Sequence, residues 1–128
     1  MKENKTSDKE GGYIELLKLK NDYTFKRVFG YTGNEEITKG LLNAILREKV
    51  TEVSLNCNTI LERDLYDDKL GILDIRAKVN NAVDINIEMQ LVDEKNIEKR
   101  IIFYLSKMYT QNLKKSHNYE ELNKCISI

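Results

Sequence analysis

The strict alternation of apolar and polar residues over 72–79 and 83–91 constrains the fold more than any other feature of the 128-residue chain. A period of two places successive side chains on opposite faces of a β-strand. Both segments are therefore predicted strands of one hairpin. Their apolar faces must coincide, because a slip of one residue would turn every side chain of one strand to the wrong face.

The connection between the two strands fixes their register. A two-residue loop would set Asp74 against Ile87 and break the apolar pattern. A loop over 80–82 pairs Val79 with Val83 and keeps the pattern. This loop contains two asparagines, and asparagine tolerates the positive φ angles of such loops better than other non-glycine residues. We therefore predict the three-residue loop.

In this register Asp74 lies opposite Glu88, and Lys78 lies opposite Asp84 as an ion pair. Directly opposed Cβ atoms are roughly 5 Å apart, and carboxylates that close repel each other unless a proton or a cation lies between them. Mg²⁺ prefers oxygen ligands, commonly one or two carboxylates with waters and phosphates. The pair is therefore a candidate metal site, and Gln90 on the same face can orient a water.

The polar faces of these strands also have a simpler interpretation, because antiparallel strands often turn their polar side to water. Two features favour a functional surface instead. Arg76 and Lys78 flank the carboxylates, and the segment after the second strand predicts a helix whose apolar stripe needs a sheet to cover. The alternation alone leaves both interpretations open.

The segments before the hairpin predict two helices and a strand. Asp22 is placed to cap a short helix that Gly30 ends in the left-handed conformation. Asn34 is placed to cap a second helix, which runs to about Leu46. From Val50 the pattern changes to period two, so Val53 and Leu55 predict a strand, which we expect to continue irregularly through Ile60 and Leu61.

The segments after the hairpin predict a long helix over about 96–115, with a buried stripe formed by Ile97, Ile101, Leu105 and Met108, and a final strand at "CISI". The resulting order α, α, β, β, β, α, β predicts a mixed α/β layer. We expect a single domain over 13–128 after a disordered leader at 1–12.

Composition argues against several classes of protein. The chain has 21 basic and 21 acidic residues, no long apolar run and two isolated cysteines, Cys57 and Cys125. A membrane span, a secretory signal, a zinc site and a disulfide framework therefore have little support, and we expect a soluble, cytoplasmic protein. Between 95 and 115, however, the sequence has six basic residues and one acidic residue, Glu98. If an anionic polymer binds to the chain, we expect it to bind there.

Five segments carry a resemblance to a known family: "NDYTFKRVFG", "EITKGLLNAIL", "LDIRA", "IEMQ" and "KRIIFYLSKMY". In this order, over roughly residues 17–128, the chain resembles the PD-(D/E)XK nuclease superfamily, and within it the recombination-promoting nuclease and putative transposase group. The resemblance implies a restriction-endonuclease-like αβββαβ core, with a mixed central sheet flanked by helices. It also implies a Mg²⁺- or Mn²⁺-dependent DNA endonuclease that hydrolyses phosphodiester bonds.

The resemblance implies roles for individual residues. Asp74 and Glu88 would hold the metal together with the backbone carbonyl of Met89. Gln90 stands where the superfamily has lysine, so water activation would depend more on the metal, and activity would be slower or lost. Asp22 matches an acidic residue of the first helix that contacts the metal through water, although we favour a plain N-cap for it.

A polar stripe on the predicted helix 96–115 is a candidate phosphate-binding surface. Arg100, Tyr104 and Lys107 follow one another at spacings of four and three and therefore share a face. Such a stripe is usually solvated, but beside a phosphodiester-cleaving site it would position DNA phosphates. We predict this role for the three residues and for Arg76.

The chain departs from its group in one respect. Members run well past the strand that "CISI" begins, so we expect an N-terminal portion that carries the nuclease core but is truncated after it. Truncation would leave an edge strand without its usual cover. The alternative to a nuclease is therefore a catalytically inactive module that binds nucleic acid or forms a homodimer.

Overall fold

The computed structural model describes residues 18–61, 69, 71–91, 95–111, 113 and 116–128. The leader expected at 1–12 and positions 112, 114 and 115 of the predicted long helix lie outside the described residues. The elements follow in the order α1 (Asp22–Phe29), α2 (Glu35–Ile45), β1 (Val53–Asn56), β2 (Ile60–Leu61), β3 (Gly71–Ile72), β4 (Ile75–Val79), β5 (Val83–Ile87), α3 (Ile97–Gln111), a 3-10 turn (Tyr119–Glu121) and β6 (Lys124–Ser127).

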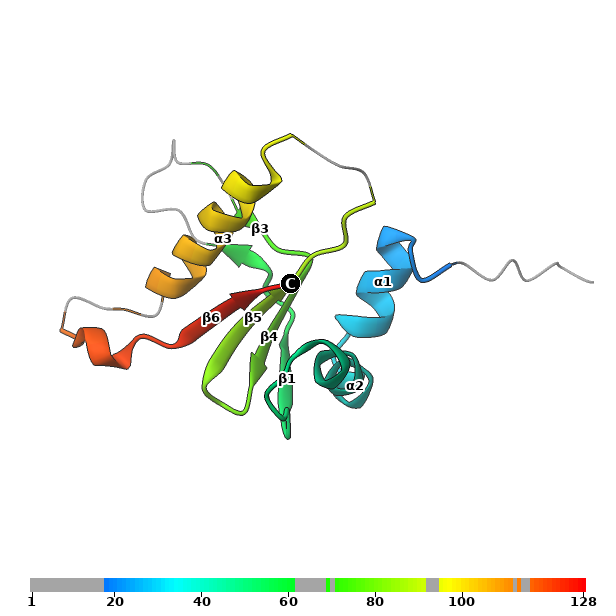
Figure 1. Cartoon of the computed structure of the whole chain (residues 1–128), viewed down its shortest axis with the longest axis horizontal. Coiled ribbons are helices and arrows are strands. Elements are labelled where there is room, and N and C mark those ends of the chain that lie inside the picture. The colour runs from blue at the N-terminus through cyan, green and yellow to red at the C-terminus, as the bar shows by residue number, and fades with distance from the viewer. Residues whose placement is uncertain (1–17, 62–68, 70, 92–94, 112, 114–115) are drawn as a thin grey trace, which may run out of the picture.

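Four strands form a mixed sheet in the order β1-β4-β5-β6, with β1, β4 and β5 antiparallel and β6 parallel to β5. β2 and β3 form a separate antiparallel pair. The strand expected at Val53 and Leu55 is confirmed as β1. Its expected continuation to 61 is wrong, because Ile60 and Leu61 pair with Ile72 and Gly71 in the small sheet. Figure 1 shows α1 and α2 on one side of the main sheet and α3 on the other. The predicted mixed α/β fold is confirmed.

The predicted hairpin register is also confirmed. β4 and β5 pair with Val79 opposite Val83. The loop residues Asn80 and Asn81 have φ angles of 50° and 54°, which places them in the left-handed region that asparagine tolerates.

One face of the main sheet carries the apolar core. Phe25 of α1 and Leu42 of α2 are buried against side chains of the central strands. The strand residues of this core are Val53, Leu55, Ile75, Ala77, Val79, Ile85 and Ile87. The period-two alternation therefore predicted this face correctly.

Gly30, directly after α1, lies close to the core. Its φ angle is −110°, so the predicted left-handed conformation is wrong. A Cβ at this position would lie 2.9 Å from Cγ1 of Ile75, so the absence of a side chain lets the end of α1 approach β4 closely.

The opposite face of the sheet is polar but is not solvated. Arg76, Asp84 and Asn86 are 8%, 6% and 0% exposed. α3 lies over this face (Figure 1), and Arg76 donates a hydrogen bond to Gln111 of α3 at 2.8 Å. Lys78 lies opposite Asp84 as predicted, but the expected ion pair between them does not form. The solvated-face interpretation therefore fails for the middle of these strands.

The apolar stripe predicted for α3 is only partly buried. The helix begins at Ile97, within one residue of its predicted start. Met108 is 1% exposed and packs in a small second core with Leu61 and Leu73. The other three stripe residues, Ile97, Ile101 and Leu105, are half-buried.

Candidate functional site

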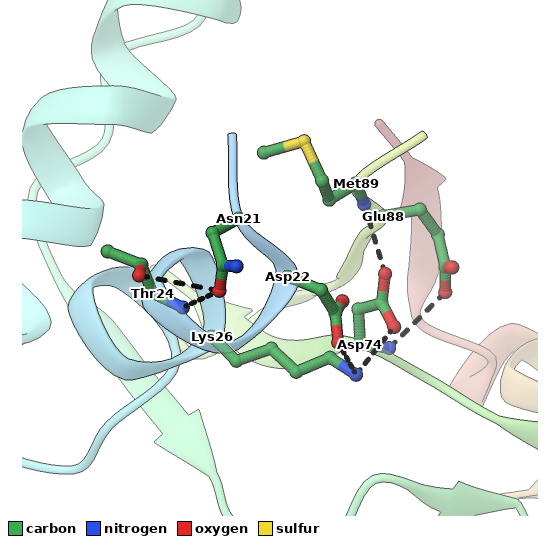
Figure 2. A network of polar contacts seen from close by, with 7 residues as sticks. All are labelled: Asn21, Asp22, Thr24, Lys26, Asp74, Glu88 and Met89. Carbon is green, nitrogen blue, oxygen red and sulfur yellow. Dashed lines mark hydrogen bonds and ion pairs between the residues drawn. The ribbon is translucent and has the colours of Figure 1, made fainter. Parts of the chain in front are cut away.

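The paired strands β4 and β5 separate at the predicted carboxylates. Their pairing ends at Ile75 and Ile87, one residue short of Asp74 and Glu88. The N–H of Asp74 donates to Oε1 of Glu88 at 3.3 Å, and the N–H of Met89 donates to Oδ2 of Asp74 at 3.0 Å (Figure 2). Where the pairing ends, the two segments are thus joined by bonds from backbone N–H groups to carboxylate oxygens. The strands are therefore shorter than the predicted 72–79 and 83–91.

Neighbouring residues fix the backbone under both carboxylates. Leu73 and Ile75, on either side of Asp74, are 2% and 1% exposed. The N–H of Glu88 donates to the carbonyl of Ile128 at 2.9 Å, which extends the pairing of β5 with β6. Because each side chain also binds the backbone of the other segment, the two acidic groups are held side by side.

The surroundings of Glu88 disfavour the charged form of its carboxyl group. Burial raises the pKa of Glu88, and the negative charge of Asp74 raises it further. A side-chain hydrogen bond from Asn86, the backbone N–H of Asp74 and the charge of Arg100 offset part of this effect. The net shift of the Glu88 pKa is upward, so burial and the charge of Asp74 outweigh the groups that stabilise the carboxylate.

A lysine from α1 also contacts this pair. Nζ of Lys26 lies 3.1 Å from Oδ1 of Asp74 and 3.4 Å from Oδ2 of Asp22 (Figure 2). Partial burial lowers the pKa of Lys26, but its hydrogen bonds and charge interactions with Asp74 and Asp22 outweigh this, and the net shift is upward. An ammonium group therefore already lies beside one of the two acidic side chains.

The start of α1 differs from the prediction. The N-cap is Asn21, whose Oδ1 accepts a hydrogen bond from the N–H of Thr24 at 3.2 Å (Figure 2). The predicted N-cap role of Asp22 is therefore wrong. Because Asn21 caps the helix, the carboxylate of Asp22 is directed to Lys26 and toward Asp74.

Lys26 was not among the residues predicted from the sequence. Its spacing of four from Asp22 predicts an ion pair on one helix, and Gln90 stands where the superfamily has lysine. Neither signal places α1 next to Asp74, because that contact depends on how the helix packs across the sheet.

The remaining residues of the site come from the segment after β5 and from α3. Arg100 donates a hydrogen bond to Oε1 of Gln90. Burial raises the pKa of Tyr104, and the charge of Glu88 raises it further. These residues form part of the wall of an open hollow of about 400 Å³. The hollow is lined by Asp22, Lys26, Ile72, Asp74, Glu88, Met89, Gln90, Leu91, Arg100 and Tyr104.

Two predicted phosphate-binding residues lie away from this hollow. Arg76 is buried under α3 and bonded to Gln111. Lys107 lies on α3 and does not line the hollow.

A second hollow of about 490 Å³ adjoins the first and shares Arg100 and Tyr104 with it. Its lining is basic and includes Lys69, Lys95 and Lys99. The two hollows thus place a run of positive charge directly beside the acidic pair.

The donor set suits a small, hard cation. Asp74 and Glu88 offer carboxylate oxygens, and Met89, whose backbone carbonyl the family resemblance implies as a further ligand, also lines the hollow. The described residues contain no cluster of three His, Cys, Asp or Glu side chains, as a structural zinc site would need. Mg²⁺ is commonly held by one or two carboxylates and completed by waters and substrate phosphates, so these residues fit that ion.

A mixed α/β fold with two acidic residues and a lysine at one open hollow is consistent with a nuclease-like domain. The profile of the PD-(D/E)XK nuclease family transposases matches residues 19–128 of the chain. The chain belongs to this family, and its function is of the nuclease or transposase type. Comparison with curated proteins and with solved structures gave no significant match. In the described part of the chain, no helix is long and apolar enough to cross a membrane.

Proposed function

We propose that the chain is a divalent-metal-dependent DNA endonuclease that hydrolyses phosphodiester bonds at Asp74 and Glu88. The observation that carries this proposal is the reciprocal bonding of the two carboxylates at an open hollow. A structural pair of acidic residues has no need of an open hollow, whereas a metal site completed by a substrate phosphate does.

The residues that would hold the ion are Asp74, Glu88 and the backbone carbonyl of Met89. When bound, Mg²⁺ or Mn²⁺ supplies a water of lowered pKa and neutralises charge on the reacting phosphate. The raised pKa of Glu88 supports this assignment, because a cation bound beside a half-buried carboxylate stabilises its charged form.

Gln90 is placed to orient rather than to deprotonate. Arg100 donates a hydrogen bond to its amide oxygen, which helps to fix the orientation of the side chain at the edge of the hollow. An amide N–H donates hydrogen bonds and does not accept a proton. Gln90 therefore positions the reacting groups without acting as a general base.

Arg100 and Tyr104 are proposed to bind the phosphates next to the cleaved bond, because they line both hollows. Lys95 and Lys99 would hold the following phosphates by charge. Lys107 would act farther along α3. The role predicted for Arg76 requires it to leave Gln111 and remains a prediction.

Cleavage of supercoiled plasmid DNA tests the proposal. Cleavage should require Mg²⁺ or Mn²⁺, and Asp74→Asn and Glu88→Gln should each reduce its rate by about 10²-fold or more. Mn²⁺ should also raise the melting temperature of the wild type, because a ligand that binds only the folded state stabilises it. Both variants should lose most of that rise.

Asp84→Asn is the matched control, because Asp84 is a buried carboxylate on β5 that does not line the site. It should retain metal-dependent cleavage. Cleavage that survives both site substitutions would contradict the proposal, since a contaminating nuclease or a different site would then be responsible.

A second function is favoured by the basic hollow beside the neutral Gln90. The chain would then bind nucleic acid without cleaving it. DNA binding that persists in EDTA, with no cleavage by the wild type in Mg²⁺ or Mn²⁺, would support this function over the first.

A further inference from the structure

The proposed site has to bring two negatively charged partners together. Asp74 and Glu88 carry negative charge, and so does a DNA phosphate. The side chain at position 90 is a neutral amide, so that position contributes no positive charge. Among the described residues that line the hollow, the cationic side chains are Lys26 and Arg100.

Lys26 and Arg100 differ in what they contact. Arg100 is bonded to the amide oxygen of Gln90. Lys26 contacts a predicted metal ligand directly, at 3.1 Å from Asp74. Its side chain is 42% exposed, so the ammonium lies within reach of a substrate in the hollow.

We propose that Lys26 of α1 is the exchangeable cation of this site: it neutralises Asp74 in the metal-free protein and contacts the scissile phosphate once the divalent ion is bound. The proposal rests on the nuclease function proposed above. Asp74 exchanges the ammonium for the ion, and Asp22 keeps the ammonium in the hollow through its own contact at 3.4 Å.

A purely structural role for Lys26 is the competing explanation. The helix α1 is already attached to the fold by other contacts, because Phe25 is buried in the core and Gly30 packs against Ile75. The hydroxyl of Thr38 donates to the carbonyl of Phe29 at 2.6 Å and ties the end of α1 to α2. A partly exposed lysine–carboxylate pair adds little to stability by comparison.

The two roles of Lys26 predict changes of opposite sign in one variant. Lys26→Met keeps the aliphatic stem and removes the charge. The affinity of the metal-free protein for Mn²⁺ should then rise by about two- to tenfold, because no ammonium competes for Asp74. The rate of plasmid cleavage at saturating Mn²⁺ should fall by about 10²-fold, as expected for a lost charge contact to the reacting phosphate.

Two further variants complete the experiment. Lys26→Arg keeps a cation at the position, so its Mn²⁺ affinity should stay near that of the wild type and its cleavage should exceed that of Lys26→Met. Lys39→Met is the matched control, because Lys39 forms an ion pair with Glu36 on α2 and does not line the hollow. It should change neither Mn²⁺ affinity nor cleavage.

Mn²⁺ affinity is measured by calorimetric titration without DNA, and the melting temperature of each variant is recorded. Weaker Mn²⁺ binding by Lys26→Met, together with a lower melting temperature, would overturn the proposal in favour of a structural role. Unchanged cleavage by Lys26→Met, when the wild type cleaves, would overturn this proposal alone. No cleavage by the wild type would instead overturn the nuclease function and the phosphate contact of Lys26 with it.

Discussion

Glu88 is half-buried beside a second carboxylate, and burial together with the charge of Asp74 raises its pKa. Between the ordinary pKa and the raised pKa, the folded chain holds this proton more tightly than the unfolded chain does. The free energy of unfolding of the metal-free protein therefore falls as pH rises through that window and stays lower above it.

We predict that Glu88→Gln stabilises the metal-free protein at neutral pH. The amide oxygen can still accept the N–H of Asp74, while the repulsion between carboxylates is removed. The melting temperature in EDTA should rise by about 2–5 °C at pH 7. Thermal melts between pH 4 and pH 8 should show this gain disappearing in acid. A gain independent of pH would contradict the assignment to Glu88.

The hydroxyl of Tyr104 is a predicted phosphate donor. The pKa of Tyr104 is raised, chiefly by burial and then by Glu88, so the hydroxyl keeps its proton at neutral pH. Tyr104→Phe should raise KM for DNA or lower kcat by about three- to tenfold, the loss of one hydrogen bond to a charged group. Its melting temperature should change little.

Tyr109→Phe is the control for this substitution, because Tyr109 lies on the same helix, is 44% exposed and does not line the site. Steady-state cleavage kinetics of both variants provide the measurement. Equal effects of the two substitutions would show that the hydroxyl of Tyr104 has no specific role.

For single residues, the local sequence pattern decided which contacts could be predicted. The opposition of Asp74 and Glu88 follows from period-two alternation and loop length, which are properties of neighbouring segments. The contact of Lys26 with Asp74 joins residues 48 positions apart in sequence. It depends on the packing of α1 against the sheet, which no periodicity specifies.

The chain approaches β4 closely at Gly30, directly after α1. A Cβ there would lie 2.9 Å from Cγ1 of Ile75 and 2.9 Å from the carbonyl oxygen of Lys26. Gly30→Ala should therefore lower the free energy of unfolding by about 1–3 kcal/mol, the usual cost of overpacking a core. Urea denaturation measures this change.

Gly40→Ala is a matched substitution with the opposite expected sign. Gly40 lies inside α2, and a Cβ there would meet no described atom within 4 Å. Alanine should raise the free energy of unfolding by about 0.5–1 kcal/mol, because glycine is a poor helix former. Equal effects at the two glycines would contradict the close-packing explanation for Gly30.

The ends of elements were harder to predict than their centres. The carboxylate of Asp22 was expected to cap α1, but Asn21 supplies the cap. Both side chains are good caps, and sequence alone does not choose between adjacent ones. The strands were expected to include Asp74 and Glu88, but these side chains bind the backbone and end the pairing. Local hydrogen bonds of this kind compete with regular pairing and leave no mark on hydrophobic periodicity.

Different helices cover the two faces of the main sheet. α1 and α2 cover the apolar face, and α3 covers the polar one, where Arg76, Asp84 and Asn86 are buried (Figure 1). The class of fold follows from the order of elements in the sequence. The alternation alone left the environment of the polar face undecided, because burial under a helix and exposure to water produce the same pattern.

This arrangement leaves the start of α3 beside the site, with a basic hollow lined by Lys95, Lys99 and Arg100. If DNA phosphates lie there, each lysine releases about one counterion on binding. Lys99→Ala should therefore weaken DNA binding in EDTA about equally for all sequences. It should also reduce the slope of log Kd against log salt concentration by about 0.9. Fluorescence anisotropy of a labelled duplex between 50 and 200 mM salt measures both, at roughly the range over which such contacts respond. Lys39→Ala, on α2 away from the hollow, should leave the slope unchanged. An equal slope for Lys99→Ala and the wild type would place the DNA elsewhere on the molecule.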